Sequence, residues 1–401
     1  MGPRQMKRTF YEFFAGGGMA RCGLGSQWRC LFANDIDENK VRSYRSYFGA
    51  SSEYLLRDIA KVRPDDVPGI ADLAWASFPC QDLSLAGNGA GLNGDRSGTF
   101  WPFWRIVSGL ISDGRAPRIV ALENVYGTLT SHQGRDFSAI CDALSEAGYQ
   151  VGAMVIDARY FVPQSRPRLF VVGARKGIRL PPFTFAQGPV QPWHPPAIIS
   201  ALHRIRHLAA SDWVWWTMAP PPSRQQKFSE LIEEHPNSVQ WHTAEETQRL
   251  LNMMSAINRA KVAAAKALRH RVIGGVYKRT RLDDSGKRVQ RAEVRFDEIS
   301  GCLRTPAGGS SRQTILVVEG QRVRSRLLSP REAARLMGLP DDYELPQNYN
   351  TAYHLAGDGV VVPVVRYLAK QILEPILEYH EAHPRRAQQL QRRYRSQAVI
   401  A

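Results

Sequence analysis

Four side chains with reactive chemistry stand where apolar runs of the sequence give way to polar loops. Cys80 lies in a Pro-Cys-Gln sequence between an apolar run and a Gly-rich stretch, 86–98. Glu123 ends the next apolar run, and Arg166 and Arg168 precede the last apolar run of this region. Taken alone, Cys80 fits a buried small hydrophobic residue. Together the four residues indicate a nucleophile, a proton donor and an anion stabiliser.

A second pattern indicates a nucleoside-binding loop. Gly16, Gly17 and Gly18 follow the first apolar run, and glycines let the backbone turn tightly beside a ligand. About 20 residues further on, Asp35 stands where a carboxylate commonly binds ribose hydroxyls. A dinucleotide site favours G-x-G-x-x-G, but Arg21 occupies the place of the third glycine. The loop disfavours NAD and leaves S-adenosylmethionine open, although a plain strand–helix turn would carry the same glycines.

These residues require a framework that brings strand ends together. Apolar runs bounded by Gly, Pro, Asp or Asn predict strands at 9–14, 28–33, 72–77, 118–122, 152–156 and 169–172. Helix-periodic stretches such as 103–111 and 137–147 separate several of them. The alternation predicts an α/β fold with a mostly parallel sheet covered by helices on both faces. In such a sheet, ligands bind at the carboxyl ends of the strands, where Cys80 and Glu123 stand.

Composition narrows the class of protein. The 401 residues carry 53 Lys and Arg against 37 Asp and Glu, a net charge of +16, which favours a nucleic-acid partner over a basic surface kept for solubility. No run of about 18 apolar residues exists, so no membrane span is expected. The five cysteines lack a C-x-x-C pair, so neither a metal site nor a disulfide framework is expected, and a reduced cytosolic protein fits best.

The sequence also predicts domain boundaries. After the region of alternating strands and helices, 1–179, a segment rich in Pro and Trp begins, and 259–295 holds twelve Lys and Arg against three Asp and Glu. We predict an inserted domain at 180–326, whose tryptophans form its core. Within it, Thr243 and Glu246 form a capping box, and Leu250, Met254 and Ile257 continue one helical stripe. The first domain is expected to close at 327–380, with helices at 330–337 and 360–377, before a basic tail at 381–401.

The order of motifs resembles the DNA (cytosine-5) methyltransferase family of bacteria and phages. The residues that carry the resemblance are Phe14-Ala15-Gly16-x-Gly18, Asn34-Asp35-x-Asp37, Asp58-Ile59, Pro79-Cys80-Gln81, Glu123-Asn124-Val125, Gln164-x-Arg166-x-Arg168, Arg326 to Pro340 and Gly357-Asp358-Gly359-Val360. Each motif is modest, but the set spans 10–377 in family order. The resemblance implies a Rossmann-like, S-adenosylmethionine-dependent methyltransferase fold with an inserted target recognition domain.

The resemblance also assigns catalytic roles. Cys80 would add to C6 of cytosine as a thiolate, and Glu123 would protonate N3, for which it must itself hold a proton. Arg168 would hold the cytosine O2, and Arg166 would orient the site. A cytosine inside a base stack cannot be reached in this way, so the target base must be flipped out of the duplex.

Cofactor residues follow from the same resemblance. Asp35 would bind the ribose of S-adenosylmethionine and Asp58 the adenine amino group, with S-adenosyl-L-homocysteine as the product. Phe14 and Ile36 would flank the adenine, with Phe100 packed nearby. The other residues expected at the cofactor are Ala15, Gly16, Gly18, Ile59, Pro79, Asp358 and Val360. The sequence departs from the family at Met19, where glycine is usual, and at Asp358, where asparagine is usual.

The basic insert, 180–326, is expected to read a sequence in double-stranded DNA. Arginine binds guanine O6 and N7 well, so the arginines of the insert are candidate base readers; most of them would otherwise contact only phosphate. The residues expected to contact DNA are Gln81, Ser84, Arg279, Arg281, Arg304 and Arg312.

Three other functions remain open from the sequence. A tRNA cytosine-5 methyltransferase would share the scaffold but usually has a small target region. A catalytically dead DNA-binding relative would not need Cys80, Glu123 and Arg168. A dinucleotide oxidoreductase lacks support from the glycine loop. We expect a cytoplasmic, nucleoid-associated monomer encoded by a bacterium or phage, with a cognate restriction endonuclease as a partner and no membrane association.

Overall fold

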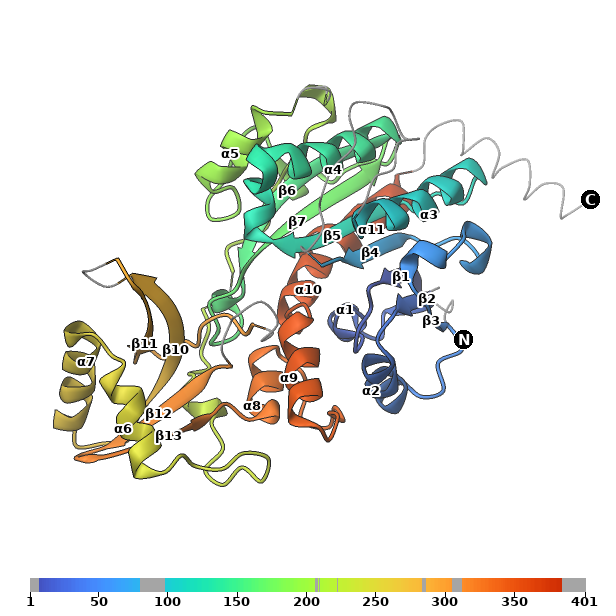
Figure 1. The fold of residues 1–401 in the computed structure, drawn as a ribbon. Helices are drawn as coiled ribbons and strands as arrows, with labels where there is room; N and C mark the ends of the chain where they lie inside the picture. The colour runs from blue at the N-terminus through green and yellow to red at the C-terminus, as the bar shows by residue number, and fades with distance from the viewer. Residues whose placement is uncertain are drawn as a thin grey trace, which may run out of the picture.

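A seven-stranded sheet organises the larger part of the molecule (Figure 1). The computed structural model describes residues 7–79, 98–205, 208, 210–221, 223–282, 286–304 and 312–383. The strand order is β3 (Tyr54–Leu56), β2 (Trp28–Asp35), β1 (Arg8–Phe13), β4 (Leu73–Ser77), β5 (Ile119–Val125), β7 (Pro167–Arg175) and β6 (Tyr149–Asp157). Only β7 runs antiparallel to its neighbours β5 and β6. The predicted mostly parallel α/β sheet is confirmed, and β3 is a short edge strand that the sequence did not indicate.

Helices cover both faces of this sheet, as expected. Alternate residues along β4 divide between two cores: Leu73 and Trp75 face one layer, and Ala74 and Ala76 face the other. The first layer holds α1 (Met19–Leu24), α10 (Val362–Leu368) and α11 (Glu374–Ala382), and the second holds α3 (Phe100–Ser112) and α4 (Arg135–Glu146). The helix α2 (Glu38–Phe48) packs on β2 and β3. We call the seven-stranded sheet and these helices the large lobe.

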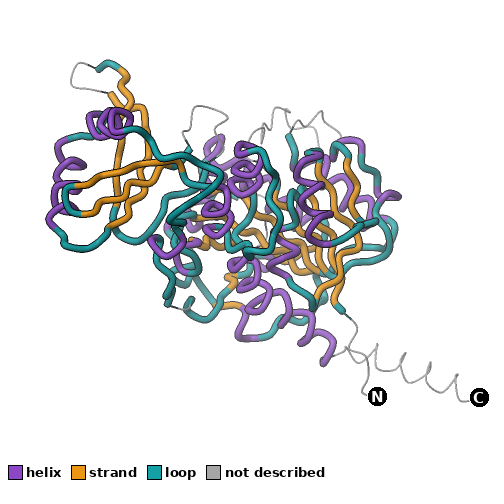
Figure 2. The backbone as a smooth tube through the Cα atoms, turned by 90° about the horizontal axis from the view of Figure 1, so that it is seen from below, coloured by secondary structure: helices purple, strands orange, loops and turns teal. Residues whose placement is uncertain are grey.

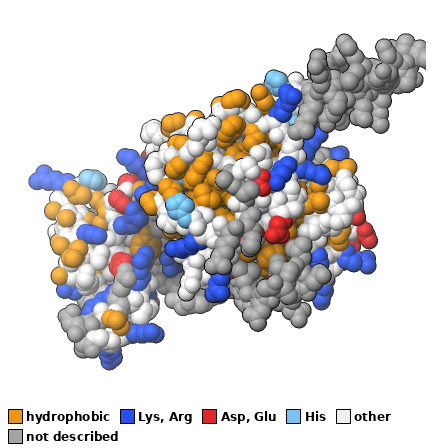
Figure 3. Space-filling model, turned by 90° about the horizontal axis from the view of Figure 1, so that it is seen from above, with side chains coloured by type: hydrophobic (Ala, Val, Ile, Leu, Met, Phe, Trp, Pro, Cys, Tyr) orange, Lys and Arg blue, Asp and Glu red, His pale blue; other side chains and the backbone are white. Residues whose placement is uncertain are grey.

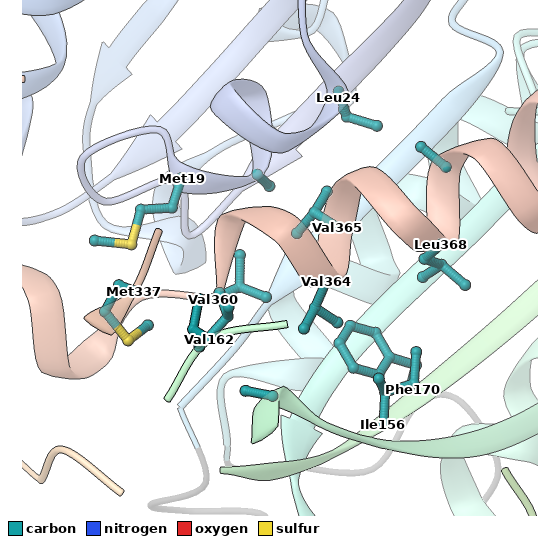
Figure 4. Close-up of a cluster of buried hydrophobic side chains, with 14 of the residues drawn as sticks. Met19, Leu24, Ile156, Val162, Phe170, Met337, Val360, Val364, Val365 and Leu368 are labelled. Atoms are coloured by element: carbon teal, nitrogen blue, oxygen red, sulfur yellow. The ribbon is translucent and has the colours of Figure 1, made fainter. Parts of the chain in front are cut away.

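The helices α1 and α10, which are far apart in the sequence, pack closely against each other. A Cβ atom at Gly23 would lie 2.4 Å from the Cβ of Val365, so only glycine permits this approach. Figure 4 shows Val364 and Leu368 of α10 between α1 and the sheet residues Ile156 and Phe170. The predicted helix at 360–377 is present as α10, a π-helical turn at Ala369–Leu373 and α11. The C-terminal segment therefore completes the large lobe.

A second sheet lies to one side of the large lobe (Figures 1 and 2). It is antiparallel, with the order β11 (Arg288–Arg295), β10 (Val272–Leu282), β12 (Thr314–Glu319) and β13 (Arg322–Leu327). The helices α6 (Ala244–Asn252) and α7 (Ala256–Ala267) cover it around a separate core that includes Leu250, Val262 and Leu316. We call this sheet and these two helices the small lobe.

The segment that follows β7 and precedes α6 in the sequence packs on the large sheet. This part contains β8 (Phe185–Ala186), α5 (Pro196–Leu202) and β9 (Trp215–Trp216). The backbone N–H of Val155 donates to the carbonyl of Trp193 at 2.8 Å, and Trp216 Nε1 donates to the carbonyl of Val172 at 3.0 Å. The expectation that the tryptophans form the core of the insert is therefore wrong for Trp193 and Trp216, which fill the core of the large lobe. The boundaries 1–179, 180–326, 327–380 and 381–401 stay predictions.

Two local predictions differ in outcome. The Thr243–Glu246 capping box is present and begins α6. The stripe through Leu250, Met254 and Ile257 is interrupted, because α6 ends at Asn252 and Ser255 begins a new helix, leaving Ile257 exposed. The predicted helix at 330–337 is confirmed as α8 (Pro330–Leu336), and α9 (Tyr349–Asp358) follows it. Within the described ranges, no helix is long and apolar enough to cross a membrane.

Candidate active site

A cavity of about 820 Å³ lies where the carboxyl ends of β1, β2, β4 and β5 meet. It brings together most of the described residues that the sequence singled out. The predicted residues that line it are Phe14, Ala15, Gly16, Asp35, Ile36, Pro79, Glu123, Arg166, Arg168, Arg304, Asp358 and Val360. Cys80, Gln81 and Ser84 lie outside the described residues, as does the side chain of Arg281. Pro79, directly before Cys80, borders the cavity.

One end of the cavity is formed by the glycine loop and the end of β2. The backbone N–H of Gly16 donates to Asp35 Oδ2 at 2.9 Å, and the N–H of Asp37 donates to Oδ1 at 2.9 Å. These two bonds fix the carboxylate, and each oxygen keeps a further lone pair for a ligand. Phe14 adopts a φ of 56°, a conformation that is costly for an aromatic residue and is found mainly at functional sites. Ile36 is 68% exposed beside the fixed carboxylate.

The other end of the cavity holds an acid beside a guanidinium. Sheet register places Glu123 opposite Ser77 on β4, and it places Arg168 opposite Val125 because β7 runs antiparallel to β5. The Arg168 Nε lies 3.2 Å from Glu123 Oε1. Burial raises the pKa of Glu123 above its ordinary value, and the positive charges of Arg168 and Arg166 only partly offset that rise. The structure therefore favours a Glu123 that can hold and donate a proton.

Arg166 connects three separate segments of the chain at this site. The side chain is 2% exposed. Its Nη1 donates to the carbonyl of Leu303 at 3.1 Å, and its Nη2 donates to the carbonyls of Gly357 and Gly359 at 2.8 and 2.9 Å. Both terminal nitrogens thus bind backbone carbonyls, which suits a residue that orients the site.

The two departures from the family pattern have physical counterparts in the cavity. Met19 is 3% exposed, and a Cβ atom at Gly359 would lie 2.1 Å from its sulfur, so the glycine makes room for the methionine. Asp358 pairs with Lys40 at 3.0 Å. Burial opposes the charge on Lys40, but the carboxylates of Asp358 and Asp35 raise its pKa above the ordinary value. A lysine therefore neutralises part of the negative charge that Asp358 brings to the cavity.

Four residues predicted at the cofactor lie behind the cavity lining or away from it. Gly18 packs under α2, since a Cβ atom there would lie 2.6 Å from Tyr44. Asp58 accepts a hydrogen bond from the N–H of Ala60 at 2.9 Å. Ile59 is buried, and Phe100 packs on Phe78, which in turn contacts Phe14. Their cofactor roles stay predictions.

The sequence analysis missed several cavity residues, among them Glu12, Lys40 and Cys302. Glu12 is 1% exposed, and burial raises its pKa to about 8; an acid inside the first apolar run was the available signal. Lys40 stands in a surface-like helix, and no local pattern marks it. Cys302 lies within reach of two arginines that are distant in sequence. Among the described residues, no cluster of His, Cys, Asp and Glu has the composition of a metal site.

The predicted DNA-reading arginines lie in different places. Arg304 borders the cavity. Arg279 lies on β10, 3.5 Å from Glu293 of β11, and Arg312 contacts Asn350 and the ring of Tyr349 at α9. Figure 3 shows Lys and Arg side chains on both lobes of one face. These side chains are scattered among hydrophobic, uncharged and acidic ones. The net charge of +16 suits a polyanionic partner.

The sheet, its helical layers and the cavity at the strand ends define a Rossmann-like fold of S-adenosylmethionine-dependent methyltransferases. The solved structure of Spodoptera frugiperda DNMT2 has a similar fold, with a TM-score of 0.56 and 17% identity over 91% of this chain and 99% of that chain.

The family model of the C-5 cytosine-specific DNA methylases matches residues 8–374, and the chain belongs to this family. It is 25% identical to the Type II methyltransferase M.BsuFI of Bacillus subtilis over 93% of this chain and 74% of that protein. It is 28% identical to the Type II methyltransferase M.NgoBI of Neisseria gonorrhoeae over 90% of this chain and 91% of that protein. The predicted DNA cytosine-5 methyltransferase function is thereby confirmed, and the tRNA and non-catalytic alternatives are not favoured.

Proposed function

We propose that this enzyme flips a cytosine out of double-stranded DNA and methylates its C5, with Cys80 as nucleophile and S-adenosylmethionine as methyl donor. The observation that carries this proposal is the convergence of Glu123, Arg166 and Arg168 on the cavity that also holds the glycine loop and Asp35. Pro79 places the start of the Pro-Cys-Gln sequence at the same cavity. The proposed acid and the groups proposed to bind the cofactor line this cavity, and Pro79, the residue before the proposed nucleophile, borders it.

The cavity residues fit S-adenosylmethionine. Asp35 offers fixed acceptor oxygens suited to ribose hydroxyls, and Phe14 and Ile36 offer apolar surface suited to a purine. Ala15, Gly16 and Val360 also line the cavity. Asp58 would bind the adenine amino group, and Gly18, Ile59 and Phe100 would lie close to the cofactor. When bound, this cofactor supplies an electrophilic methyl group. Asp358, paired with Lys40, lines the same cavity.

The residues of the chain supply the remaining chemistry. The thiolate of Cys80 adds to C6, and Glu123 donates its proton to N3, so that negative charge does not build up in the ring. Arg168, beside Glu123, donates to the cytosine O2. After methylation, a base removes the C5 proton, the bond between C6 and sulfur breaks to release the Cys80 thiolate, and Glu123 takes back the proton from N3. Arg166 holds the segment 357–360 against the start of β7 during the reaction, through its bonds to the carbonyls of Gly357 and Gly359.

The DNA would lie across both lobes. Lys and Arg side chains supply phosphate contacts, and base-edge contacts from the small lobe supply sequence. Arg304 at the cavity and Arg279 on β10 are our first candidates, with Arg281, Arg312, Gln81 and Ser84 as further contacts. Because relatives such as M.BsuFI are Type II methyltransferases, we place this enzyme in a bacterial or phage restriction–modification system, with a cognate endonuclease. It would act as a cytoplasmic, nucleoid-associated monomer.

Expression in a methylation-free bacterial host tests this function. Conversion sequencing of the host DNA should reveal protected cytosines in one short motif, and an empty vector and the Cys80→Ser chain should leave every cytosine converted. If the soluble protein protects no cytosine, the DNA assignment fails, and transfer of methyl groups to tRNA would then be measured with the same preparation.

Asp35→Ala should weaken binding of S-adenosylhomocysteine by about 10-fold to 100-fold. Loss of a hydrogen bond to a charged group costs about 1.5–3 kcal/mol, and the fixed carboxylate is expected to make such bonds. Calorimetric titration measures this affinity without requiring turnover. Asp65→Ala, a change to an exposed carboxylate away from the cavity, is the matched control. Equal affinities of the two variants would contradict the assignment of Asp35.

A further inference from the structure

Cys302 has an unusual setting for a cysteine that the reaction does not use. Its Sγ lies 3.4 Å from Arg166 Nη1 and 3.8 Å from Arg168 Nη2, and its side chain borders the cavity. Arg168 therefore stands between two partners, because its Nε faces Glu123 and its Nη2 faces Cys302. The thiol is part of the same charge cluster as the proton donor.

The position of Cys302 is fixed by backbone contacts between the lobes. It belongs to the segment 300–304, which connects β11 and β12 of the small lobe. The N–H of Ser165 donates to the carbonyl of Ser300 at 2.9 Å, and the N–H of Ser300 donates to the carbonyl of Pro163 at 2.7 Å. The N–H of Leu303 donates to Gln164 Oε1 at 3.0 Å. The small lobe thus places one sulfur atom beside the arginines of the large lobe.

The positive charges of Arg166 and Arg168 favour a negative charge at Cys302. Five charged or titratable side chains lie near Cys302 or near the two arginines that it contacts. They are Arg304 from the same segment, Arg166 and Arg168 at the start of β7, Glu123 from β5 and Tyr353 from α9. The guanidinium groups stay positive at all working pH values. When Glu123 holds the proton that it must donate, it no longer balances them. Of the groups in this cluster, the Cys302 thiol is then the one that can supply negative charge.

The electrostatics agree with this geometry. Burial alone would raise the pKa of the Cys302 thiol, but Arg166, Arg168 and Arg304 together hold it below the ordinary cysteine value. By contrast, burial raises the pKa of Cys30, in β2, to about 12. Sγ also lies 3.4 Å from the carbonyl of Leu303, to which a neutral thiol would donate. The carbonyl of Leu303 already accepts a hydrogen bond from Arg166. Experiment can distinguish a neutral Cys302 thiol from a thiolate.

We propose that Cys302 is a positioning residue whose thiolate balances Arg166 and Arg168, so that Glu123 is able to keep its proton for the target cytosine. The inference rests on the proposed function, because it assumes that Glu123 is the proton donor. Removing the thiolate would leave Glu123 as the anionic partner of Arg168. The carboxyl group would then lose its proton at lower pH.

The test is the pH profile of kcat for methylation of duplex DNA. Activity that needs protonated Glu123 falls as pH rises through its pKa. In Cys302→Ser and Cys302→Ala this descending limb should move to lower pH by roughly one unit, because the ionised Glu123 carboxylate is then the anion left to pair with Arg168, 3.2 Å away. Cys302→Asp supplies another anion and should restore the limb. Cys30→Ser, which removes a thiol away from the cavity, should leave the limb unchanged.

A second measurement needs no change at position 302. In the Cys80→Ser chain, alkylation of each cysteine by iodoacetamide is followed against pH by mass spectrometry. The peptide that contains Cys302 should reach half its maximal alkylation rate at a pH below the usual pKa of a cysteine thiol. An unshifted limb in active Cys302→Ser and Cys302→Ala proteins, or a Cys302 that titrates at or above ordinary cysteine pH, would overturn the inference. If wild type itself does not methylate DNA, the proposed function fails instead.

Discussion

Cys80→Ser is expected to lower kcat by roughly 10⁴-fold to 10⁶-fold, the scale on which enzymes lose activity when a nucleophile is removed. A serine hydroxyl stays protonated at neutral pH, so it cannot add to C6 as a thiolate does. Pro79 at the cavity and Glu123 on the neighbouring strand put the start of this sequence beside the proton donor. The hydrogen bond from Asn124 Nδ2 to the carbonyl of Phe78, 3.1 Å, fixes the end of β4.

Single-turnover methyl transfer to duplex DNA measures the loss, and calorimetry with S-adenosylhomocysteine shows whether the cofactor site survives. Cofactor affinity should stay near wild type, because the substitution changes one atom and leaves the glycine loop and the fixed carboxylate of Asp35 as they are. The matched control is Cys30→Ser, whose side chain contacts the hydroxyl of Tyr44 and lies away from the cavity. Substantial turnover by Cys80→Ser would refute covalent catalysis through this residue.

Arg326→Met is expected to lower the free energy of unfolding by about 3–5 kcal/mol, the cost of stranding one charge of a buried ion pair. Arg326 and Glu332 are both fully buried, and two hydrogen bonds of 2.6 and 2.8 Å join them. Arg326 also donates to the carbonyl of Glu233 and lies over the ring of Trp241. The pair stands where β13 of the small lobe leads into α8, so its loss should loosen the junction of the lobes.

Urea denaturation followed by circular dichroism measures this effect. Arg42→Met breaks an exposed pair with Glu38 and should change stability by less than about 0.5 kcal/mol. The double variant Arg326→Met, Glu332→Gln neutralises the stranded charge, and glutamine still suits the capping box with Ser329. It should be more stable than Arg326→Met alone. A single variant as stable as Arg42→Met would show that the junction does not depend on the pair.

The sequence was sufficient to predict six of the seven strands of the large sheet, because these six are nearly continuous apolar runs with clear boundaries. Reactive residues at the ends of successive runs meet in a parallel sheet whatever the details of packing, so Glu123 and Asp35 could be assigned to one edge. The place of Arg168 beside Glu123 also required β7 to run antiparallel. The resemblance to a known family carried that information, whereas strand periodicity did not.

Other features depend on contacts between distant segments and carry no local pattern. Cys302 and Lys40 join the cavity because the small lobe and the last motif fold back onto the large sheet. Trp193 and Trp216 read as the core of an insert, yet their indole rings fill the large lobe, since composition does not tell which neighbour a segment packs against. Ile257 continues an apolar stripe in sequence but is exposed because Ser255 starts a new helix.

The three backbone carbonyls that Arg166 binds have a consequence for the order in which this enzyme becomes competent during synthesis. Leu303, Gly357 and Gly359 leave the ribosome long after Arg166 and the rest of the sheet edge. Until they arrive, a buried guanidinium lacks its acceptors, and the wall around Asp358 and Val360 does not exist. A chain truncated before Leu303 carries the acid and the glycine loop but lacks these three acceptors and the cavity wall around Asp358 and Val360. We therefore expect such a chain not to methylate DNA.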